Sequence, residues 1–173
     1  LAGDAVTTGQ ENVYIGYGAA TTDDQSDANV VIGSLAGAEM NHGDATGFTT
    51  IVGYQAGFYN VTGTSNTYIG YRAGHGSSNQ SNATNTAVGR EAMLQVTTGG
   101  TNSFLGSGAG LGVTSGSNNF GIGADSGRSG SPGGGIATSS NIGVLGDENI
   151  SSLNCQVALT VASDERDKTD FVD

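Results

Sequence analysis

The sequence has few of the residues that hold helical or disulfide-bonded domains together. It contains one cysteine, one proline and no tryptophan. The single cysteine, Cys155, can form no intrachain disulfide, so we expect it to act as a small buried hydrophobic residue. Only 12% of the residues are charged, whereas the exposed faces of helices are rich in Glu, Lys and Arg. The composition therefore argues against a helical domain.

Basic residues are also scarce: the chain has 5 Lys and Arg and 16 Asp and Glu. The first basic residue is Arg72. The net charge of −11 leaves no basic stripe for phosphates or for anionic lipids, which argues against nucleic-acid and membrane-surface partners. No apolar run approaches the roughly 18 residues that cross a bilayer, and no signal peptide opens the chain. Leu1 is not a natural start, so we expect a fragment of a longer protein.

Glycine is abundant, with 31 residues, and most of it belongs to an internal repeat. The pattern is Asn-x-x-(Ile/Val/Leu)-Gly-x-x-Ala-Gly. Its copies begin at Asn12, Asn29, Thr49, Asn66, Asn85, Asn102 and Asn119, and a degenerate copy ends at Gly143. The glycines of the Ile-Gly step fall at positions 16, 33, 53, 70, 89, 106, 123 and 143, which lie 17 to 20 residues apart. Such a period indicates a solenoid.

A second half-motif, Val-Thr-(Thr/Ser)-Gly or Val-Thr-Gly, joins the copies and adds another short β-prone stretch to each unit. A unit of this length is too short for a pair of helices. Extra residues occur only between the Ala-Gly and the next Asn slot, as loops on one edge of a solenoid would. The sequence therefore predicts an all-β, parallel β-roll or β-helix of about eight coils over residues 1–146. Stacked Asn side chains are expected to form a ladder along it.

Alternation along each strand places neighbouring residues on opposite faces. We expect the residue before each Ile-Gly glycine to point into the coil: Ile15, Ile32, Val52, Ile69, Val88, Leu105 and Ile122. The preceding residues would then point outward: Tyr14, Val31, Ile51, Tyr68, Ala87, Phe104 and Gly121. Because that outward row is mostly apolar, the prediction is a homotrimer that covers it. The alternative is a wider monomeric β-helix with both rows inside.

Candidate chemical groups lie mainly in the turns and insertions. The acidic residues Asp23, Asp24, Asp27, Asp147 and Glu148 sit in polar, glycine-rich surroundings and are expected to be solvated, and His42 and His75 are interpreted as loop histidines. No metal or cofactor is expected. Tyr17, Tyr54 and Tyr71 share the slot after Ile-Gly, where they would form a partial ladder; we expect them to pack, although exposed rings would stack on sugars.

The repeat ends after Gly146, and an alternating run at 155–161 predicts one strand within a connecting segment, residues 147–163. The charged run that follows, Ser163-Asp164-Glu165-Arg166-Asp167-Lys168, resembles the junction at which the intramolecular chaperone of endosialidase-type phage tailspikes and tail fibres begins. The resemblance implies that residues 164–173 open such a chaperone. It also implies a cut between Ser163 and Asp164, with Ser163 as nucleophile and Lys168 as base. Asp167 and Phe171 depart from the family's aliphatic residues, and a solvated polar tail is the alternative interpretation.

The repeats themselves resemble the β-roll heads of trimeric autotransporter adhesins, whose period is shorter. Together the two resemblances imply a segment of a trimeric phage tail fibre in the virion, with other tail proteins and a host-surface glycan or protein as partners. No enzymatic activity other than the self-cleavage is expected. A polysaccharide-degrading tailspike and a trimeric adhesin of the bacterial surface are the alternatives.

Overall fold

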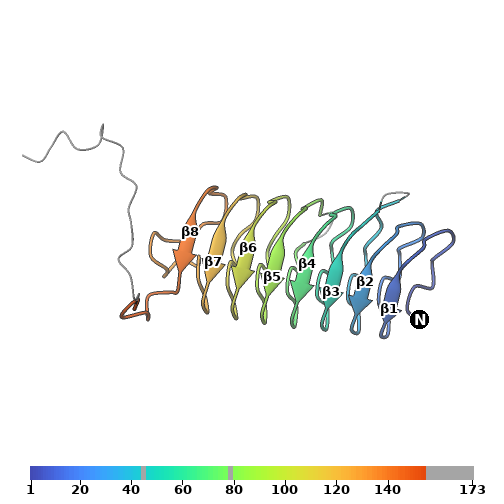
Figure 1. Ribbon diagram of the computed structural model, residues 1–173, viewed down its shortest axis with the longest axis horizontal. Helices are drawn as coiled ribbons and strands as arrows, with labels where there is room; N and C mark the ends of the chain where they lie inside the picture. The colour runs from blue at the N-terminus through green and yellow to red at the C-terminus, as the bar shows by residue number, and fades with distance from the viewer. Residues whose placement is uncertain (44–45, 78–79, 155–173) are drawn as a thin grey trace, which may run out of the picture.

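One parallel sheet runs the length of a rod, with its strands side by side and connected by loops (Figure 1). The computed structural model describes residues 1–43, 46–77 and 80–154. The strands are β1 (Val13–Ile15), β2 (Val30–Ile32), β3 (Thr50–Val52), β4 (Thr67–Ile69), β5 (Thr86–Val88), β6 (Ser103–Leu105), β7 (Phe120–Ile122) and β8 (Gly143–Leu145). Each pairs in parallel with the next one along the chain. The predicted all-β parallel solenoid is confirmed.

The register of the last coil differs from the prediction. Gly143 pairs with Phe120, so the residue equivalent to Gly123 is Gly146, whose N–H donates to the carbonyl of Ile122 at 2.7 Å. The last step from glycine to glycine is therefore 23 residues, from 123 to 146, and not 20. The Ile-Gly pair at Ile142 misleads because Ile142 fills the Asn slot: its N–H donates to Oδ1 of Asn119 at 2.9 Å.

The second β-prone stretch of each unit forms bends rather than strands in the described residues. Threonine ties these return arcs together. Both the N–H and the hydroxyl of Thr97 donate to the carbonyl of Thr114, at 2.9 and 3.1 Å, and Thr114 repeats the pair with Ala137, at 2.8 and 3.1 Å. The expected second strand is thus replaced by a hydrogen-bonded arc.

The predicted inside and outside of the strands are inverted. The middle residue of each strand points inward, which buries Val31, Ile51, Tyr68, Ala87, Phe104, Gly121 and Val144 and half-buries Tyr14. The residue before each corner glycine points outward instead, and Ile15 is 56% exposed. The reason is the thinness of the coil. The middle row shares its buried cluster with a column of small residues, which leaves space for a single row of strand side chains. These small residues are Ala19, Ala36, Ala56, Ala73, Ala92, Ala109 and Ser126.

The interior is filled by matching large residues to small ones. The ring of Phe104 lies so close to Gly110 and Gly121 that a Cβ on either glycine would come within 2.6 Å of a ring carbon. Tyr68 has the same relation to Gly74. The middle row varies in size along the rod because each large ring needs small residues around it. The row before the corner, which is uniformly Ile, Val or Leu, has no such constraint.

The predicted Asn ladder is confirmed. Asn102 Nδ2 donates to Asn85 Oδ1 at 3.0 Å, and other hydrogen bonds of the ladder run from side chain to backbone. Oδ1 of Asn102 accepts from the N–H of Asn119 at 3.0 Å, while its Nδ2 donates to the carbonyl of Gly116 at 2.8 Å. Asn85 makes the equivalent pair with Asn102 and Gly99, at 3.0 and 2.8 Å. Each buried amide therefore satisfies backbone groups at the corner that no strand can reach.

Candidate functional site: an apolar sheet face

The main feature of the surface is the row before the corner glycines, which we call the outer stripe. It comprises Ile15, Ile32, Val52, Ile69, Val88, Leu105, Ile122 and Leu145, one residue from each strand. Leu105 and Ile122 are 53% and 52% exposed. Because the strands pair in register, these side chains follow one another from coil to coil along the rod. A continuous apolar row of this length on a soluble surface usually marks an interface.

The row at the start of the strands completes the outer face of the sheet. It comprises Val13, Val30, Thr50, Thr67, Thr86, Ser103, Phe120 and Gly143. None of the outward residues in either row is charged. Any partner of this face is therefore held by burial of apolar surface, and not by ion pairs.

The outer face of the sheet is hollowed in its C-terminal half. A cavity of about 280 Å³ lies over β5, β6 and β7, and Val88, Leu105 and Ile122 are among the residues that line it. Gly121 is among the lining residues and contributes no side chain to fill the cavity. The volume suits the side chains of a second apolar surface.

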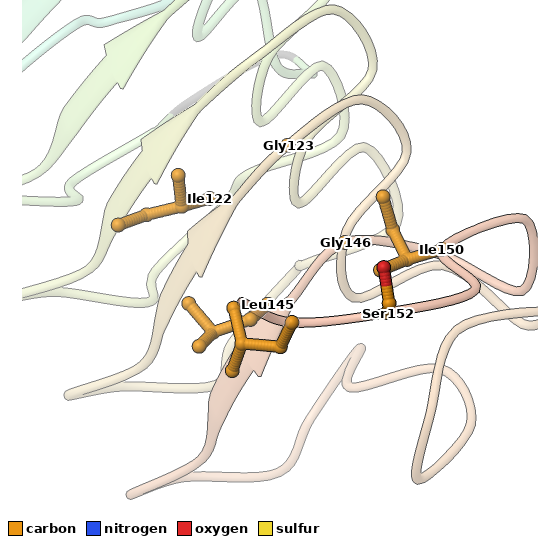
Figure 2. Close-up of a pocket in the computed structure, with 7 residues that line it drawn as sticks. Ile122, Gly123, Leu145, Gly146, Ile150 and Ser152 are labelled. Carbon is orange, nitrogen blue, oxygen red and sulfur yellow. The ribbon is translucent and has the colours of Figure 1, made fainter. Parts of the chain in front are cut away.

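A second cavity of about 270 Å³ continues the stripe at its C-terminal end. Figure 2 shows Ile122 and Leu145 on the two last strands, with Ile150 on the segment that follows Gly146. Ile150 and Leu153 are both 56% exposed, so the chain adds apolar surface to this end of the stripe instead of covering it. The stripe is thus open along the whole described sheet.

The tyrosines after the corner glycines form the partial ladder that the repeat predicts. The rings of Tyr54 and Tyr71 are nearly parallel, at 8°, with centroids 5.7 Å apart. Contrary to our expectation of packed rings, these two are 47% and 46% exposed and Tyr17 is 76% exposed. The prediction overlooked that the corner glycine turns this slot outward.

Among the candidate acids, Asp23 is fully buried, so the expectation of a solvated side chain is wrong there. Its carboxylate accepts hydrogen bonds from the hydroxyls of Tyr14 and Ser26. Desolvation by burial raises the pKa of Asp23, and burial together with the neighbouring carboxylate raises that of Tyr14. Asp27 accepts from the N–H of Gln10 at 2.6 Å. These contacts are structural: the two hydrogen bonds of Asp23 close a loop within one unit, and the bond to Asp27 spans one full repeat.

At the other end of the rod, Asp147 lies in a turn where the side chain and backbone N–H of Asn149 bind its carboxylate and lower its pKa. Glu148 lines a polar cavity of about 220 Å³ together with Arg128 and with Asp125, which sequence reasoning did not single out. Arg128 lies 2.5 Å from Asp125. An ion pair between a guanidinium and a carboxylate is not the arrangement of a proton donor beside a nucleophile.

The two histidines lie in apolar or crowded places. His75 stacks on Phe58 and packs edge-on to Tyr59, and burial lowers its pKa. His42 is almost completely buried, and burial lowers its pKa as well. Within the described residues no group of three or more His, Cys, Asp or Glu is placed to hold a metal ion.

Several predictions fall on residues outside those that the structure describes. They are the self-cleavage residues Ser163, Asp164 and Lys168, Cys155 and the strand expected at 155–161. They remain predictions from the sequence.

No family model, curated protein or solved structure matches this chain. In the described part of the chain, no helix is long and apolar enough to span a membrane.

Proposed function

We propose that this chain is a rigid structural segment of a fibre, and that copies of it associate side by side through the outer stripe. The support is the pairing of a fold that extends along one axis with an uncharged apolar face along the same axis. Strands about 4.8 Å apart give the sheet a length of roughly 35 Å. A rod of this kind transmits mechanical load along its axis and holds the parts at its two ends a fixed distance apart.

Cyclic symmetry about an axis parallel to the rod suits this face. Every coil offers an Ile, Val or Leu at the same position, so each rung meets the same rung of its neighbours without any change in register. Three-fold symmetry is the state that both resemblances imply, and we propose a homotrimer. The inversion of the two strand rows moves the seam from Tyr14 and its equivalents to Ile15 and its equivalents.

The finer part of the proposal is that the fibre is a phage tail fibre which attaches the virion to a host surface. It rests on the resemblance of Ser163–Lys168 to the chaperone junction of such fibres. In this proposal the only reaction of the chain is the cut between Ser163 and Asp164, which mass spectrometry of a longer chain carrying the residues beyond Asp173 tests directly.

The association is tested by a charge in the stripe. Val88→Asp puts a carboxylate in the middle of the sheet face, and Thr98→Asp puts the same charge on an exposed return arc. Light scattering after size exclusion is expected to give three chain masses for the wild type and for T98D, and one chain mass for V88D. A monomeric wild type that keeps its β circular dichroism, or a trimeric V88D, contradicts the proposed association through the stripe.

A further inference from the structure

The slot after the corner glycines forms a column of residues along the rod. In that column Ser34 interrupts the exposed tyrosines, and we call its position the missing rung. Backbone hydrogen bonds link the slot after the corner glycine from coil to coil: Leu35 N–H to the Tyr17 carbonyl at 2.8 Å, and Gln55 N–H to the Ser34 carbonyl at 3.0 Å. Arg72 N–H continues the series to the Tyr54 carbonyl at 2.9 Å. The column therefore reads Tyr17, Ser34, Tyr54, Tyr71, with one small residue between two aromatic ones.

Tyr54 and Tyr71 show what a filled rung looks like, since adjacent rings in this column stack with centroids 5.7 Å apart. Tyr17 and Tyr54 stand two coils apart, or about 9.6 Å at the ordinary spacing of strands. A ring above Ser34 would lie about 5 Å from each tyrosine, which is wider than direct face-to-face carbon contact and leaves room for a thicker group.

The spacing selects the kind of ring. A flat aromatic group in contact on both faces needs carbon–carbon distances of about 3.5–4.0 Å, which is a total of roughly 7–8 Å between the tyrosines. A pyranose is thicker, because it is puckered and carries axial C–H bonds, so it fills the wider gap. The net charge of −11 disfavours acidic sugars. We propose that Tyr17 and Tyr54 hold a neutral pyranose over Ser34, with one tyrosine on each face of the sugar ring.

Contact on both faces demands a sugar without an axial hydroxyl. A β-glucopyranoside and its N-acetylglucosamine analogue present only C–H bonds on both faces, whereas the axial O4 of a galactoside would put a hydroxyl against one tyrosine. Tyrosine suits this role because its ring packs on the C–H face while its hydroxyl stays in water or binds the equatorial hydroxyls. The site is therefore specific for gluco-configured units of a polysaccharide.

This inference deepens the adhesive part of the proposed function. The role of the sugar site in host attachment rests on that proposal, whereas the binding of the sugar itself does not. The probes are methyl β-glucoside, methyl N-acetyl-β-glucosaminide and methyl β-galactoside, and the measurement is saturation-transfer NMR on the assembled wild-type chain. Signals from the ring C–H protons of the first two are expected to exceed those of the galactoside several-fold. Light scattering on the same sample reports the proposed association separately, so one can fail without the other.

Ser34→Tyr fills the missing rung. It is expected to weaken the binding of the glucoside and of the N-acetylglucosaminide about tenfold, which corresponds to roughly 1.4 kcal/mol. Ser107→Tyr is the matched control, because Ser107 occupies the same column between Arg90 and Ala124, where no tyrosine is adjacent. Tyr54→Ala should lose the binding as well, and thermal melts verify that all three variants fold. Binding by S34Y equal to the wild type, loss of binding in S107Y, a galactoside that binds best, or no signal from any of the three sugars overturns the proposal.

Discussion

The ring of Phe104 lies directly against Gly121 on the neighbouring strand, and a Cβ on Gly121 would come within 2.5 Å of two ring carbons. This contact crosses from β6 to β7 inside the coil, where Phe104 is only 1% exposed. It explains why a glycine stands in the middle of a strand, a position that glycine usually weakens. Gly121 leaves the space that the ring of Phe104 occupies.

Gly121→Ala should therefore destabilise the rod by overpacking. We expect a loss of about 1–3 kcal/mol in the free energy of unfolding, because the ring and the small residues around it are fully packed. Gly112→Ala is the control, since a Cβ there meets nothing within 4 Å, and it should be neutral or slightly stabilising. Urea denaturation measures both. Relief of the G121A defect by Phe104→Leu in a double-mutant cycle would identify the ring as the cause, and purely additive effects would contradict it.

The corner glycines are held by a different constraint. Gly70 has a φ of +134°, and a Cβ on it would lie 2.5 Å from the carbonyl oxygen of Gly89 in the next coil. Gly70→Ala thus combines a backbone conformation that L-residues avoid with a clash against backbone that cannot move. We expect a loss of more than about 3 kcal/mol, or failure to fold, since both costs add.

The control for this variant is Gly133→Ala, where φ is +83° but a Cβ meets nothing within 4 Å. It should lose only about 1–2 kcal/mol, the cost of the left-handed conformation by itself. Thermal melts of the two variants compare the effects. Equal losses would show that the close approach at the corner contributes nothing.

The period, the parallel pairing and the Asn ladder were predictable because they depend on local spacing. The inside and the outside of the strands were not, since both rows are apolar and the choice depends on the space behind the sheet. A signal was present. Of these two rows, only the middle one mixes large residues such as Tyr68 and Phe104 with small ones such as Ala87 and Gly121, and size matching of this kind is typical of a core. A uniform row of Ile, Val and Leu is what an interface between identical copies requires.

The burial of Asp23 also had a signal that went unused. Tyrosine occurs in the middle row twice, and both times the following loop supplies an acceptor for its hydroxyl: Asp23 for Tyr14 and Asn82 for Tyr68. A buried tyrosine hydroxyl needs a partner, so the loop residue is drawn inward with it. The contribution of Gly146 to the last corner was hidden because Ile142-Gly143 imitates the motif three residues early.

The Asn ladder makes a separate prediction at Asn102, which is fully buried. Asn102→Ala leaves the N–H of Asn119 and the carbonyl of Gly116 without partners, and each buried orphan costs about 1–3 kcal/mol. Asn102→Thr should cost less, because a hydroxyl can replace one of the two bonds and threonine fills this slot naturally at Thr49. Hydrogen exchange of the Asn119 amide is expected to speed up in N102A more than in N102T. The reverse order would show that the amide contributes packing and not hydrogen bonds.

The buried carboxylate of Asp23 should make the stability of the first coils depend on pH. Its pKa is raised in the folded state, mainly by desolvation, so the folded chain binds this proton more tightly than the unfolded chain does. The ionised group therefore costs stability above its folded pKa, and that cost disappears as pH falls toward the ordinary value of about 3.9. Asp23→Asn keeps an acceptor for Tyr14 without the charge. It should be more stable than the wild type at pH 7, and the difference should shrink as pH is lowered.

Asp147→Asn supplies the opposite sign. Hydrogen bonds from Asn149 lower the pKa of Asp147, so its contribution to stability is present at neutral pH and is lost as pH falls below its ordinary value. D147N should therefore be less stable than the wild type at pH 7, with a difference that vanishes at low pH. Urea melts from pH 2 to 8 measure each variant against the wild type, which cancels the remaining acidic residues. A D23N difference that stays constant across this range, or that follows D147N in sign, would mean that the carboxylate of Asp23 is solvated as the sequence had suggested.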